Sequence, residues 1–380
     1  MKVLHLISGG DTGGAKTHII FLLRALQEKL ETKIVCFTKE SFYYDVKKAG
    51  INIEVLEQEK RYDMSIVSKL KKKVDKEGYD IIHCHGARAN FIGVLLKRKI
   101  NLPFITTIHS DYELDFKDNF YKKIIFTKIN TLALKKFDYY IAISNNFRNM
   151  LISRGFKEEK IFTIYNGIDM DNEIFFMPKN EFLNRYGIDG KGKTIFGIIG
   201  RLDLVKGHET FIEAANLVLK DRKDVLFLIA GTGNDEVRLK EMVKELGLEE
   251  NIYFLDFVED QYSFFNAIDV NILTSLSESF PYVILEGAKL KKPVISTKVG
   301  GIGDLLKDGY NGYLIEVGAV EELVQYILLF LENKPSMKVM GDNLYRTVNE
   351  KFSSKKMGQE HFNIYKKIVE TRRNSHENNK

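Results

Sequence analysis

The chain has 380 residues, 44% of them hydrophobic and 29% charged, with five prolines; this composition excludes a disordered or fibrous protein, and the length predicts two domains. No apolar run reaches the roughly 18 residues of a membrane span, and the N-terminal run breaks at Gly9, too early for a signal peptide. The net charge of +5 is mild, and no nucleic-acid-binding motif accompanies it, so we expect no nucleic-acid partner.

Short β-rich runs alternate with longer amphipathic segments along the chain, in two series. The first series predicts strands over residues 3–7, 33–38, 80–84, 104–108 and 139–143. The alternation lapses over residues 170–192, which we interpret as the domain junction. The second series predicts strands over residues 194–199, 225–230, 252–255, 270–273 and 293–296, and a final helix follows over 357–372.

Two such series predict an α/β protein with two Rossmann-like, doubly wound parallel sheets facing each other across a cleft. We expect one domain over residues 1–172 and the other over 173–356. In open α/β sheets, ligands bind at the carboxyl ends of the strands, so functional residues are expected in the turns that follow strands.

Two further features bear on the cellular setting. Cys36 and Cys84 lie in apolar runs without CxxC spacing, which predicts buried reduced thiols and, with no leader, a cytoplasmic protein. Basic residues cluster at 71–73, 97–99 and 122–123. These clusters fit solvated helix faces, and an anionic membrane surface is the alternative partner.

In the first half, a glycine-rich turn follows the first strand, with Gly13 and Gly14 opening a helix. The spacing fits neither a P-loop nor a GxGxxG fingerprint, so it predicts a plain turn or a loop that approaches a phosphate or sugar hydroxyl. His109 follows the fourth predicted strand and is expected to point into the cleft, with a structural role as the alternative for a lone histidine. His83 and His85 form an HxH pair, but no third or fourth ligand is spaced nearby, so we assign no metal.

In the second half, Arg201 and Lys206 lie on one strand-to-helix turn. Two cations at this spacing can reach the two phosphates of a diphosphate, which we favour here over the alternative of two solvated surface cations. Gly231 and Gly233 end the next strand, where a simple turn and a ligand contact are equally compatible with the spacing.

The segment 277–288 is the most informative part of the sequence. Ser279 is predicted to cap a helix with Pro281 in its first turn, which would present free N–H groups to a diphosphate. Glu278 lies ahead of that helix and Glu286 about two turns further on, so one carboxylate can face a sugar and the other a ribose. Glutamates at this separation are also common on solvated helices.

These motifs together resemble the nucleotide-sugar glycosyltransferases of family 4, retaining enzymes of the GT-B fold. The resemblance runs from the Gly13–Gly14 turn through residues 141–144, 166–169, 200–207 and 278–286 to 293–301 and 308–312. It implies that the final helix crosses back onto the first domain. It also implies that no divalent metal and no cofactor are needed, since the nucleotide-diphosphate sugar is a co-substrate.

The resemblance also implies residue roles. Arg201 and Lys206 would bind the donor diphosphate, Glu286 the ribose and Glu278 the transferred sugar, which His109 would contact from the first domain. Phe257 and Val258 would frame the base. The implied catalytic residues are thus His109, Arg201, Lys206 and Glu278, and the remaining donor-binding residues are Gly13, Gly14, Gly231, Gly233, Phe257, Val258, Ser279, Phe280, Pro281, Tyr282, Val283 and Glu286.

Two details limit this assignment. Ser110 separates His109 from the acidic residue expected directly after it, so Asp111 receives no role. The Asp169-Met170-Asp171 triplet matches the metal-binding DxD of another glycosyltransferase architecture, but it falls in the junction and is ascribed to chance. Retention without an evident carboxylate nucleophile favours a front-face mechanism as a hypothesis.

The sequence therefore predicts a retaining transferase that moves a hexosyl or N-acetylhexosaminyl unit from a UDP- or GDP-sugar to a glycan or lipid-linked acceptor in cell-surface polysaccharide synthesis. The basic and aromatic segment 112–137 favours peripheral contact with the membrane's inner face. A non-hydrolysing nucleotide-sugar epimerase of similar fold and a non-catalytic sugar-binding protein are the alternatives.

Overall fold

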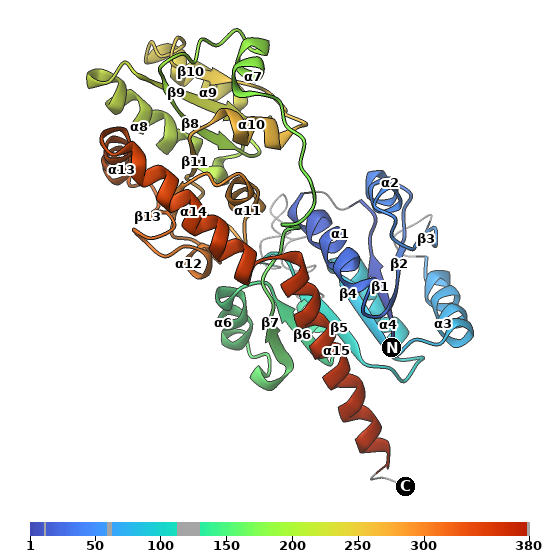
Figure 1. Ribbon diagram of the computed structural model, residues 1–380. Helices are drawn as coiled ribbons and strands as arrows, with labels where there is room; N and C mark the ends of the chain where they lie inside the picture. The colour runs from blue at the N-terminus through green and yellow to red at the C-terminus, as the bar shows by residue number, and fades with distance from the viewer. Residues whose placement is uncertain (11–12, 59–62, 112–129, 378–380) are drawn as a thin grey trace. The chain divides into compact units, whose positions relative to one another are not determined.

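The computed structural model describes residues 1–10, 13–58, 63–111 and 130–377. The chain folds as two compact units, each with its own sheet (Figure 1). Unit 1 comprises Met1–Asp169 and Ser353–Lys380, and unit 2 comprises Met170–Phe352. The chain thus changes unit after Asp169 and Phe352, where the sequence led us to expect boundaries after residues 172 and 356.

Unit 1 contains a parallel sheet, seven-stranded in the described part of the chain, in the order β3-β2-β1-β4-β5-β6-β7. The strands are β1 (Lys2–Ile7), β2 (Glu31–Cys36), β3 (Ile53–Val55), β4 (Ile81–His85), β5 (Phe104–Ile108), β6 (Tyr139–Ala142) and β7 (Ile161–Thr163). The described helices are α1 (Gly14–Leu26), α2 (Ser41–Lys48), α3 (Ser65–Glu77), α4 (Ala87–Lys97), α6 (Asn145–Ser153) and α15 (Ser354–Glu377).

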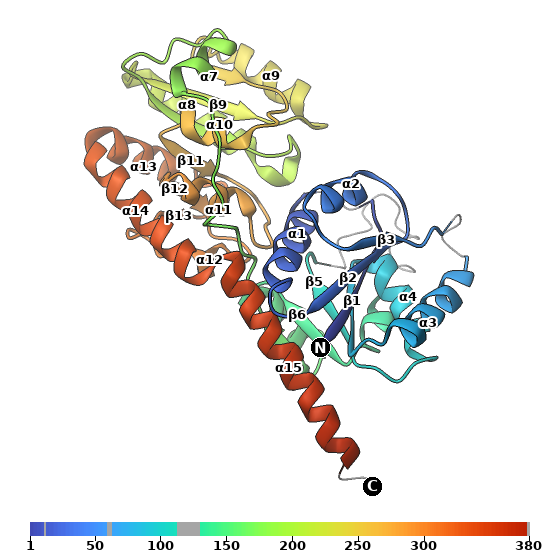
Figure 2. The ribbon, with the colours of Figure 1, turned by 45° about the vertical axis from the view of Figure 1, so that its right-hand side comes forward.

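The C-terminal helix α15 belongs to unit 1, where it lies beside α1 (Figures 1 and 2). Tyr365 and Ile368 of α15 are buried in one cluster with Leu22 and Leu26 of α1 and with Val3 of β1. Burying a side chain of this size contributes about 1.5–3 kcal/mol. The apolar spacing read from the sequence of this helix is therefore its packing face against the sheet.

Unit 2 contains a second parallel sheet, six-stranded over the described residues, in the order β10-β9-β8-β11-β12-β13. The strands are β8 (Thr194–Ile199), β9 (Val225–Ala230), β10 (Ile252–Phe254), β11 (Val270–Leu273), β12 (Val294–Thr297) and β13 (Tyr313–Ile315). The helices are α7 (Lys179–Arg185), α8 (His208–Asp221), α9 (Glu236–Glu245), α10 (Gln261–Ala267), α11 (Tyr282–Lys289), α12 (Ile302–Leu305), α13 (Val320–Glu332) and α14 (Lys334–Lys351).

Helices cover both faces of the second sheet (Figure 2). One buried cluster joins α8, α9 and α13 to the sheet, and another joins α7 and α10 to its other face. Strands buried on both sides are continuous apolar runs, as in β9, whose six residues are all buried. The predicted class, two doubly wound parallel-sheet units, is confirmed.

All ten predicted strands are present, and the sequence missed β3, β7 and β13. Each of these has three residues and lies at the edge of its sheet. Such short segments carry few residues to show a period, although β10, which is equally short and also at an edge, was predicted.

Cys36 and Cys84 are free and buried, as predicted. None of the helices in the described part of the chain is both long and apolar enough to cross a membrane. Lys71 and Lys73 of the first basic cluster form ion pairs with acidic residues of α3 and β3. The cluster at 122–123 and most of the segment 112–137 lie outside the described residues.

Candidate functional site

The strand order places a topological switch point in unit 2 between β8 and β11. In a doubly wound sheet, the connections leaving two such strands run to opposite sides, which opens a crevice at their carboxyl ends. The turn after β8 carries Arg201 and Lys206, and the turn after β11 carries Glu278. The fold thus brings two segments about 70 residues apart in sequence to one edge of one sheet.

Hydrogen bonds hold these two turns together. The Leu276 N–H donates to the Val205 carbonyl at 2.8 Å, and the Thr274 hydroxyl donates to the Lys206 carbonyl at 3.3 Å. Gly207 makes this approach possible, because a Cβ there would lie 2.2 Å from the Thr274 carbonyl oxygen and its φ is +63°. The position of Lys206 is therefore fixed by the end of β11.

Lys206 and Glu278 form the central ion pair of this site. The Lys206 Nζ lies 2.6 Å from Glu278 Oε1, which also accepts a 2.7 Å hydrogen bond from the Ser275 hydroxyl. Their side chains are 21% and 9% exposed, so the pair is largely shielded from water. An ammonium has three N–H donors, and Glu278 engages one of them among the described residues, which leaves Lys206 able to bind an anion as well.

Arg201 lies on the same turn but in a different environment. Its side chain is 75% exposed and pairs with Asp203 at 2.8 Å. A long, exposed guanidinium can move to a phosphate at small cost, because an exposed ion pair is worth only about 0–1 kcal/mol.

Glycines pack the neighbouring turns against these residues. A Cβ on Gly231 would lie 1.8 Å from the Gly200 carbonyl oxygen, and one on Gly233 would lie 2.3 Å from that of Leu202. Both glycines therefore accommodate the backbone of the Arg201 turn, a close approach within the chain that the sequence did not distinguish from a ligand contact. Their role in donor binding stays a prediction.

Gly300, in the turn after β12, supports Glu278 in the same way. Its φ is +56°, and a Cβ would lie 1.7 Å from the Glu278 carbonyl oxygen. The neighbouring Gly301 N–H donates to the Ser279 carbonyl at 2.9 Å. The loop carrying Glu278 is thus held from the β8 side and the β12 side.

Gly300→Ala is expected to lower the free energy of unfolding by about 2–3 kcal/mol, because it combines left-handed strain with a backbone clash. Gly303→Ala is the matched control: a Cβ there meets nothing within 4 Å, and alanine favours the helix α12. Urea unfolding of the two variants checks this. Equal midpoints would contradict the packing argument.

Helix α11 follows the Glu278 loop, and one prediction about it is wrong. The helix begins at Tyr282 with Pro281 at the cap position and no side-chain cap, so Ser279 does not cap it. The Ser279 carbonyl instead accepts from the Gly301 N–H, next to the close contact of Gly300 with the Glu278 carbonyl. The first-turn N–H groups of α11, Val283 among them, remain without helical acceptors and favour an anion.

Two residues of this segment have clear environments. Phe280 is buried against Phe352, with ring centroids 5.3 Å apart. This contact anchors the loop between Glu278 and α11. Glu286 lies on α11, and burial raises the pKa of its carboxyl to about 7. A carboxylate that is partly protonated at neutral pH is a candidate for binding hydroxyl groups.

Phe257 and Val258 follow β10, the edge strand next to β9. Phe257 is 73% exposed, and Val258 is half-buried and packs on the α7–α10 cluster. Asp256 just before them has a φ of +52°, and its carbonyl accepts from the Gly231 N–H at 2.7 Å. An exposed ring on a braced turn is available to stack on a planar ligand.

In unit 1, the residues predicted to approach the donor surround the ends of β1 and β5. Gly13 precedes α1 with a φ of +64°, and a Cβ there meets nothing within 4 Å; Gly14 is the first residue of α1. His109 follows β5 and is half-buried. Its Nε2 lies 3.3 Å from His85 Nδ1. Its ring makes an edge contact with the His18 ring, with the two ring centroids 4.8 Å apart.

His109 is part of a histidine cluster that the sequence did not reveal. His5 pairs with His83 in the β1–β4 register, and α1 and α15 add His18 and His361. The sequence shows the individual histidines, but their alignment depends on the register of the strands in the assembled sheet. The cluster consists of His5, His18, His83, His85, His109 and His361, with Tyr365 beside it.

The expectation that the HxH pair lacks a third nearby ligand is wrong. His5 from β1 lies with His83 and His85, with one ring nitrogen of each within 4.8 Å of the others. Both His83 nitrogens are already engaged, by the Tyr365 hydroxyl at 2.6 Å and the Thr107 hydroxyl at 2.8 Å. A cation would have to displace these bonds, so we continue to propose no metal here.

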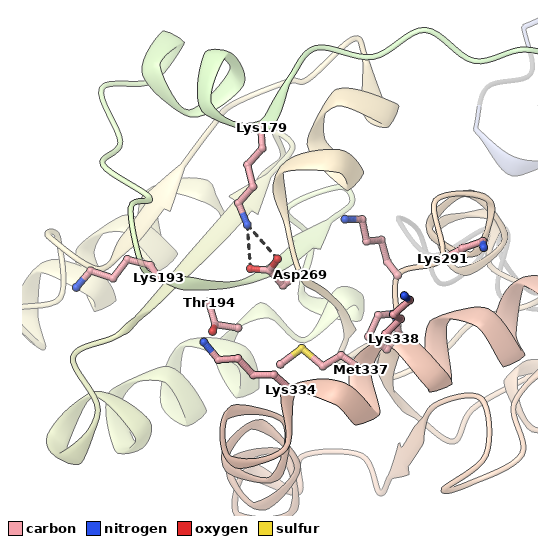
Figure 3. A pocket seen from close by; sticks show the side chains of 10 residues that line it. Lys179, Lys193, Thr194, Asp269, Lys291, Lys334, Met337 and Lys338 are labelled. Atoms are coloured by element: carbon pink, nitrogen blue, oxygen red, sulfur yellow. Dashed lines mark hydrogen bonds and ion pairs between the residues drawn. The ribbon is translucent and has the colours of Figure 1, made fainter.

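A lysine-lined pocket of about 410 Å³ lies elsewhere in unit 2 (Figure 3). Thr194 begins β8, and Asp269 and Pro293 precede β11 and β12, so this pocket is at the amino ends of the strands. Asp269 accepts from Lys179 Nζ at 3.0 Å. The pocket is thus at the edge opposite Lys206 and Glu278 and is not the predicted site.

Comparisons with known proteins identify the family of this chain. Residues 12–172 match the family described as Glycosyltransferase Family 4, and residues 179–347 match Glycosyl transferases group 1. The chain is 26% identical over 317 residues to N-acetyl-alpha-D-glucosaminyl L-malate synthase of Bacillus anthracis, covering 82% of this chain and 81% of the relative. It is 26% identical over 375 residues to the O-antigen biosynthesis glycosyltransferase WclY of Escherichia coli, covering 97% and 99%.

A third relative is the UDP-Gal:alpha-D-GlcNAc-diphosphoundecaprenol alpha-1,3-galactosyltransferase of Escherichia coli, 25% identical, covering 74% of this chain and 73% of the relative. Among solved structures, Anabaena Alr3699/HepE in complex with UDP superposes with a TM-score of 0.83 at 22% identity, covering 97% of this chain and 100% of that one. A glycosyltransferase from Rickettsia africae gives 0.81 at 21% identity, covering 97% and 98%. The chain belongs to the GT-B-fold glycosyltransferases of family 4 and group 1.

Proposed function

We propose that this glycosyltransferase moves a hexosyl or N-acetylhexosaminyl unit from a UDP- or GDP-sugar to a glycan or lipid-linked acceptor, with retention of configuration, in cell-surface polysaccharide synthesis. The observation that carries the proposal is the convergence of Lys206, Glu278 and the start of α11 at the switch point of the second sheet. A cation and a helix N-terminus at one edge form a site for a diphosphate.

We assign the donor parts as follows. Lys206 and Arg201 bind the diphosphate together with the N–H groups at the start of α11, Glu286 binds the ribose, and Phe257 supports the base. Glu278, held by Lys206 and Ser275, is the carboxylate nearest the diphosphate and takes the transferred sugar. Two cations and a helix dipole supply the charge that a metal supplies elsewhere, so we propose transfer without a divalent ion.

For the chemical step, we propose a front-face mechanism. The acceptor hydroxyl attacks the anomeric carbon from the side that the diphosphate leaves, and the departing phosphate oxygen accepts the hydroxyl proton. Lys206 and Arg201 stabilise the charge that develops on that oxygen. A product of inverted anomeric configuration would contradict this mechanism.

The acceptor proposal rests on two relatives. One is named for O-antigen biosynthesis, and the other is named for transfer to GlcNAc-diphosphoundecaprenol. We propose that the chain uses an acceptor of this kind and contacts an anionic membrane peripherally. Recruitment to vesicles that contain phosphatidylglycerol at low salt is expected, and failure of the protein to sediment with them would contradict the contact.

Donor affinity is expected to depend on pH through Glu286. Burial raises its pKa to about 7, and the charged carboxylate accepts stronger hydrogen bonds from the ribose hydroxyls than the protonated acid does. Affinity should therefore fall as pH drops below 7, by up to about tenfold per unit, and level off above 8. Calorimetric titration of nucleotide between pH 5.5 and 8.5 checks this, with Glu286→Gln expected to bind weakly with no pH dependence.

The proposed reaction can be tested directly. The purified protein in EDTA is incubated with a panel of UDP- and GDP-sugars and a lipid-linked acceptor extract, and nucleotide release and product anomers are followed. One selected donor, turned over only with acceptor and with its configuration kept, is the expected result. Epimerisation of a nucleotide sugar without acceptor would support the epimerase instead, and no reaction with any donor would contradict the proposal.

A further inference from the structure

The histidines of unit 1 form a hydrogen-bonded chain that leads to His109. His5 Nδ1 lies 3.1 Å from His85 Nε2, and His85 Nδ1 lies 3.3 Å from His109 Nε2. His5 and His85 are buried, and His109 is half-buried at the end of β5. Among the described residues, His109 Nδ1 has no hydrogen-bond partner, and it does not belong to the fully buried unpaired atoms.

Each member of this chain is neutral. Burial lowers the pKa of His5 to about 3, with a lesser contribution from repulsion by His18 when that ring is protonated, and burial holds the pKa values of His85 and His109 well below their usual range. A neutral imidazole carries one N–H and one lone pair. Each link of the chain needs one of each, so only two arrangements of the protons are possible.

In one arrangement, His109 donates from Nε2 to His85, which donates to His5, and the proton of His5 is on Nε2. That atom is buried and has no partner among the residues that the structure describes, so this arrangement leaves an N–H unsatisfied. In the other, His5 donates from Nδ1 to His85, which donates from Nδ1 to His109, and only a lone pair stays unpaired at His5. Buried N–H groups without an acceptor are rarer in folded proteins than buried acceptors without a donor, so the second arrangement is favoured.

Two neighbouring histidines show the same pattern independently. His18 Nδ1 lies 2.9 Å from Asn166 Oδ1, and His361 Nδ1 lies 2.9 Å from the Met357 carbonyl oxygen. Both partners are acceptors, so the N–H is on Nδ1 in each ring. Their Nε2 atoms are buried without a partner, like that of His5. The unpaired nitrogens of this cluster are thus lone pairs.

We propose that His5 and His85 are positioning residues that hold His109 in its Nδ1–H form, so that His109 presents a hydrogen-bond donor and no basic lone pair to the sugar. The chemical meaning rests on the proposed function: His109 binds a sugar oxygen and is not the general base of the reaction. This agrees with a step in which the departing phosphate takes the acceptor proton.

The tautomer can be read without any turnover, by long-range ¹H–¹⁵N correlation spectra of the full chain labelled with ¹⁵N-histidine at pH 7.5. The His109 signals are assigned as those missing in His109→Gln. The expected spectrum has a protonated Nδ1 and an unprotonated Nε2, with a preference on the order of tenfold or more. A wild-type His109 protonated on Nε2 would overturn the proposal, whether or not any donor is turned over.

Variants test the chain itself. His5→Leu removes the first donor without touching His109 and is expected to reduce the Nδ1–H preference of His109 to a mixture, whereas His5→Asn keeps a donor near the Nδ1 position and should preserve it. His83→Leu is the matched control, because it removes an equally buried histidine of β4 that is bonded to Tyr365 and Thr107 and not to this chain. An unchanged His109 tautomer in folded His5→Leu would contradict the relay.

An activity readout completes the test. His109→Asn keeps an amide donor and is expected to retain more of kcat than His109→Asp, which offers only acceptors. For the wild type, kcat is expected to stay constant from pH 6.5 to 8.5, while KM changes through Glu286. Greater activity in His109→Asp would overturn the donor role. If no donor sugar is turned over at all, the proposed function fails while the spectra still decide the tautomer.

Discussion

Lys206→Ala is expected to lower kcat/KM for the donor by about 10²–10³, the cost of removing one group that stabilises charge on a leaving oxygen. Lys206 is mostly shielded, bonded to Glu278 at 2.6 Å and fixed by the close approach of Gly207 to Thr274. Its loss also leaves Glu278, 9% exposed, without its cation. The expected defect is therefore larger than for the exposed Arg201.

The control for this prediction is Lys220→Ala. Lys220 is an exposed lysine in the last turn of α8, so its removal changes the net charge equally but leaves the turn after β8 untouched. Steady-state kinetics with the selected donor should place Lys220→Ala within about twofold of wild type. If Lys206→Ala performs as well as Lys220→Ala, the diphosphate does not lie where we assign it.

Unit 1 is expected to unfold in mild acid before unit 2. Burial lowers the pKa values of the histidines in its core, to about 3 for His5 and His361, to about 4 for His18, and well below the usual range for His83 and His85. The unfolded chain takes up these protons near pH 6.5 and the folded chain does not. Stability is therefore full above about 6.5 and is lost as pH falls toward the folded pKa values.

Each fully buried histidine contributes up to about 1.4 kcal/mol per pH unit in this window. For the five buried residues the loss reaches several kcal/mol by about pH 5.5, comparable with the 5–15 kcal/mol that holds a typical domain together. In unit 2, His208 has a pKa lowered to about 4 by burial and by Lys206, whereas Glu286, with its pKa raised to about 7, favours folding in acid. These two effects oppose each other.

Hydrogen exchange between pH 7.5 and 5 separates the two units, because peptides from β1 and β4 report on one and those from β8 and β9 on the other. Tryptophan fluorescence cannot be used, since the chain contains no tryptophan. We expect protection of β1 and β4 to fall first, and replacement of His18 by Asn to reduce the acid sensitivity. Simultaneous loss in both units would show that the histidines do not set the acid limit.

The sequence revealed the two sheets because their central strands are buried on both faces and are therefore continuous apolar runs. Three edge strands, each only three residues long, were missed. The positions of Arg201, Lys206 and Glu278 in turns were predictable, since the turns follow recognisable strands. Their roles came from the family resemblance and not from spacing.

What the sequence could not show is how distant turns fit together. The pairing of Lys206 with Glu278 depends on a glycine that lets two backbones approach, and no local pattern reports such a contact. No local pattern reported the environment of Ser279 either. It does not cap α11, and its carbonyl accepts a hydrogen bond from the Gly301 N–H. The histidine chain required the β1–β4 register, which sets His5 against His83 and is a property of the assembled sheet.

The most direct test of the account is amide hydrogen exchange of the full chain with and without UDP or GDP, in EDTA. We predict that one nucleotide slows exchange in the turn 200–207 and in the segment 274–284, where the cations and the start of α11 meet. Protection by neither nucleotide, or protection confined to the lysine pocket around residues 334–338, would contradict it.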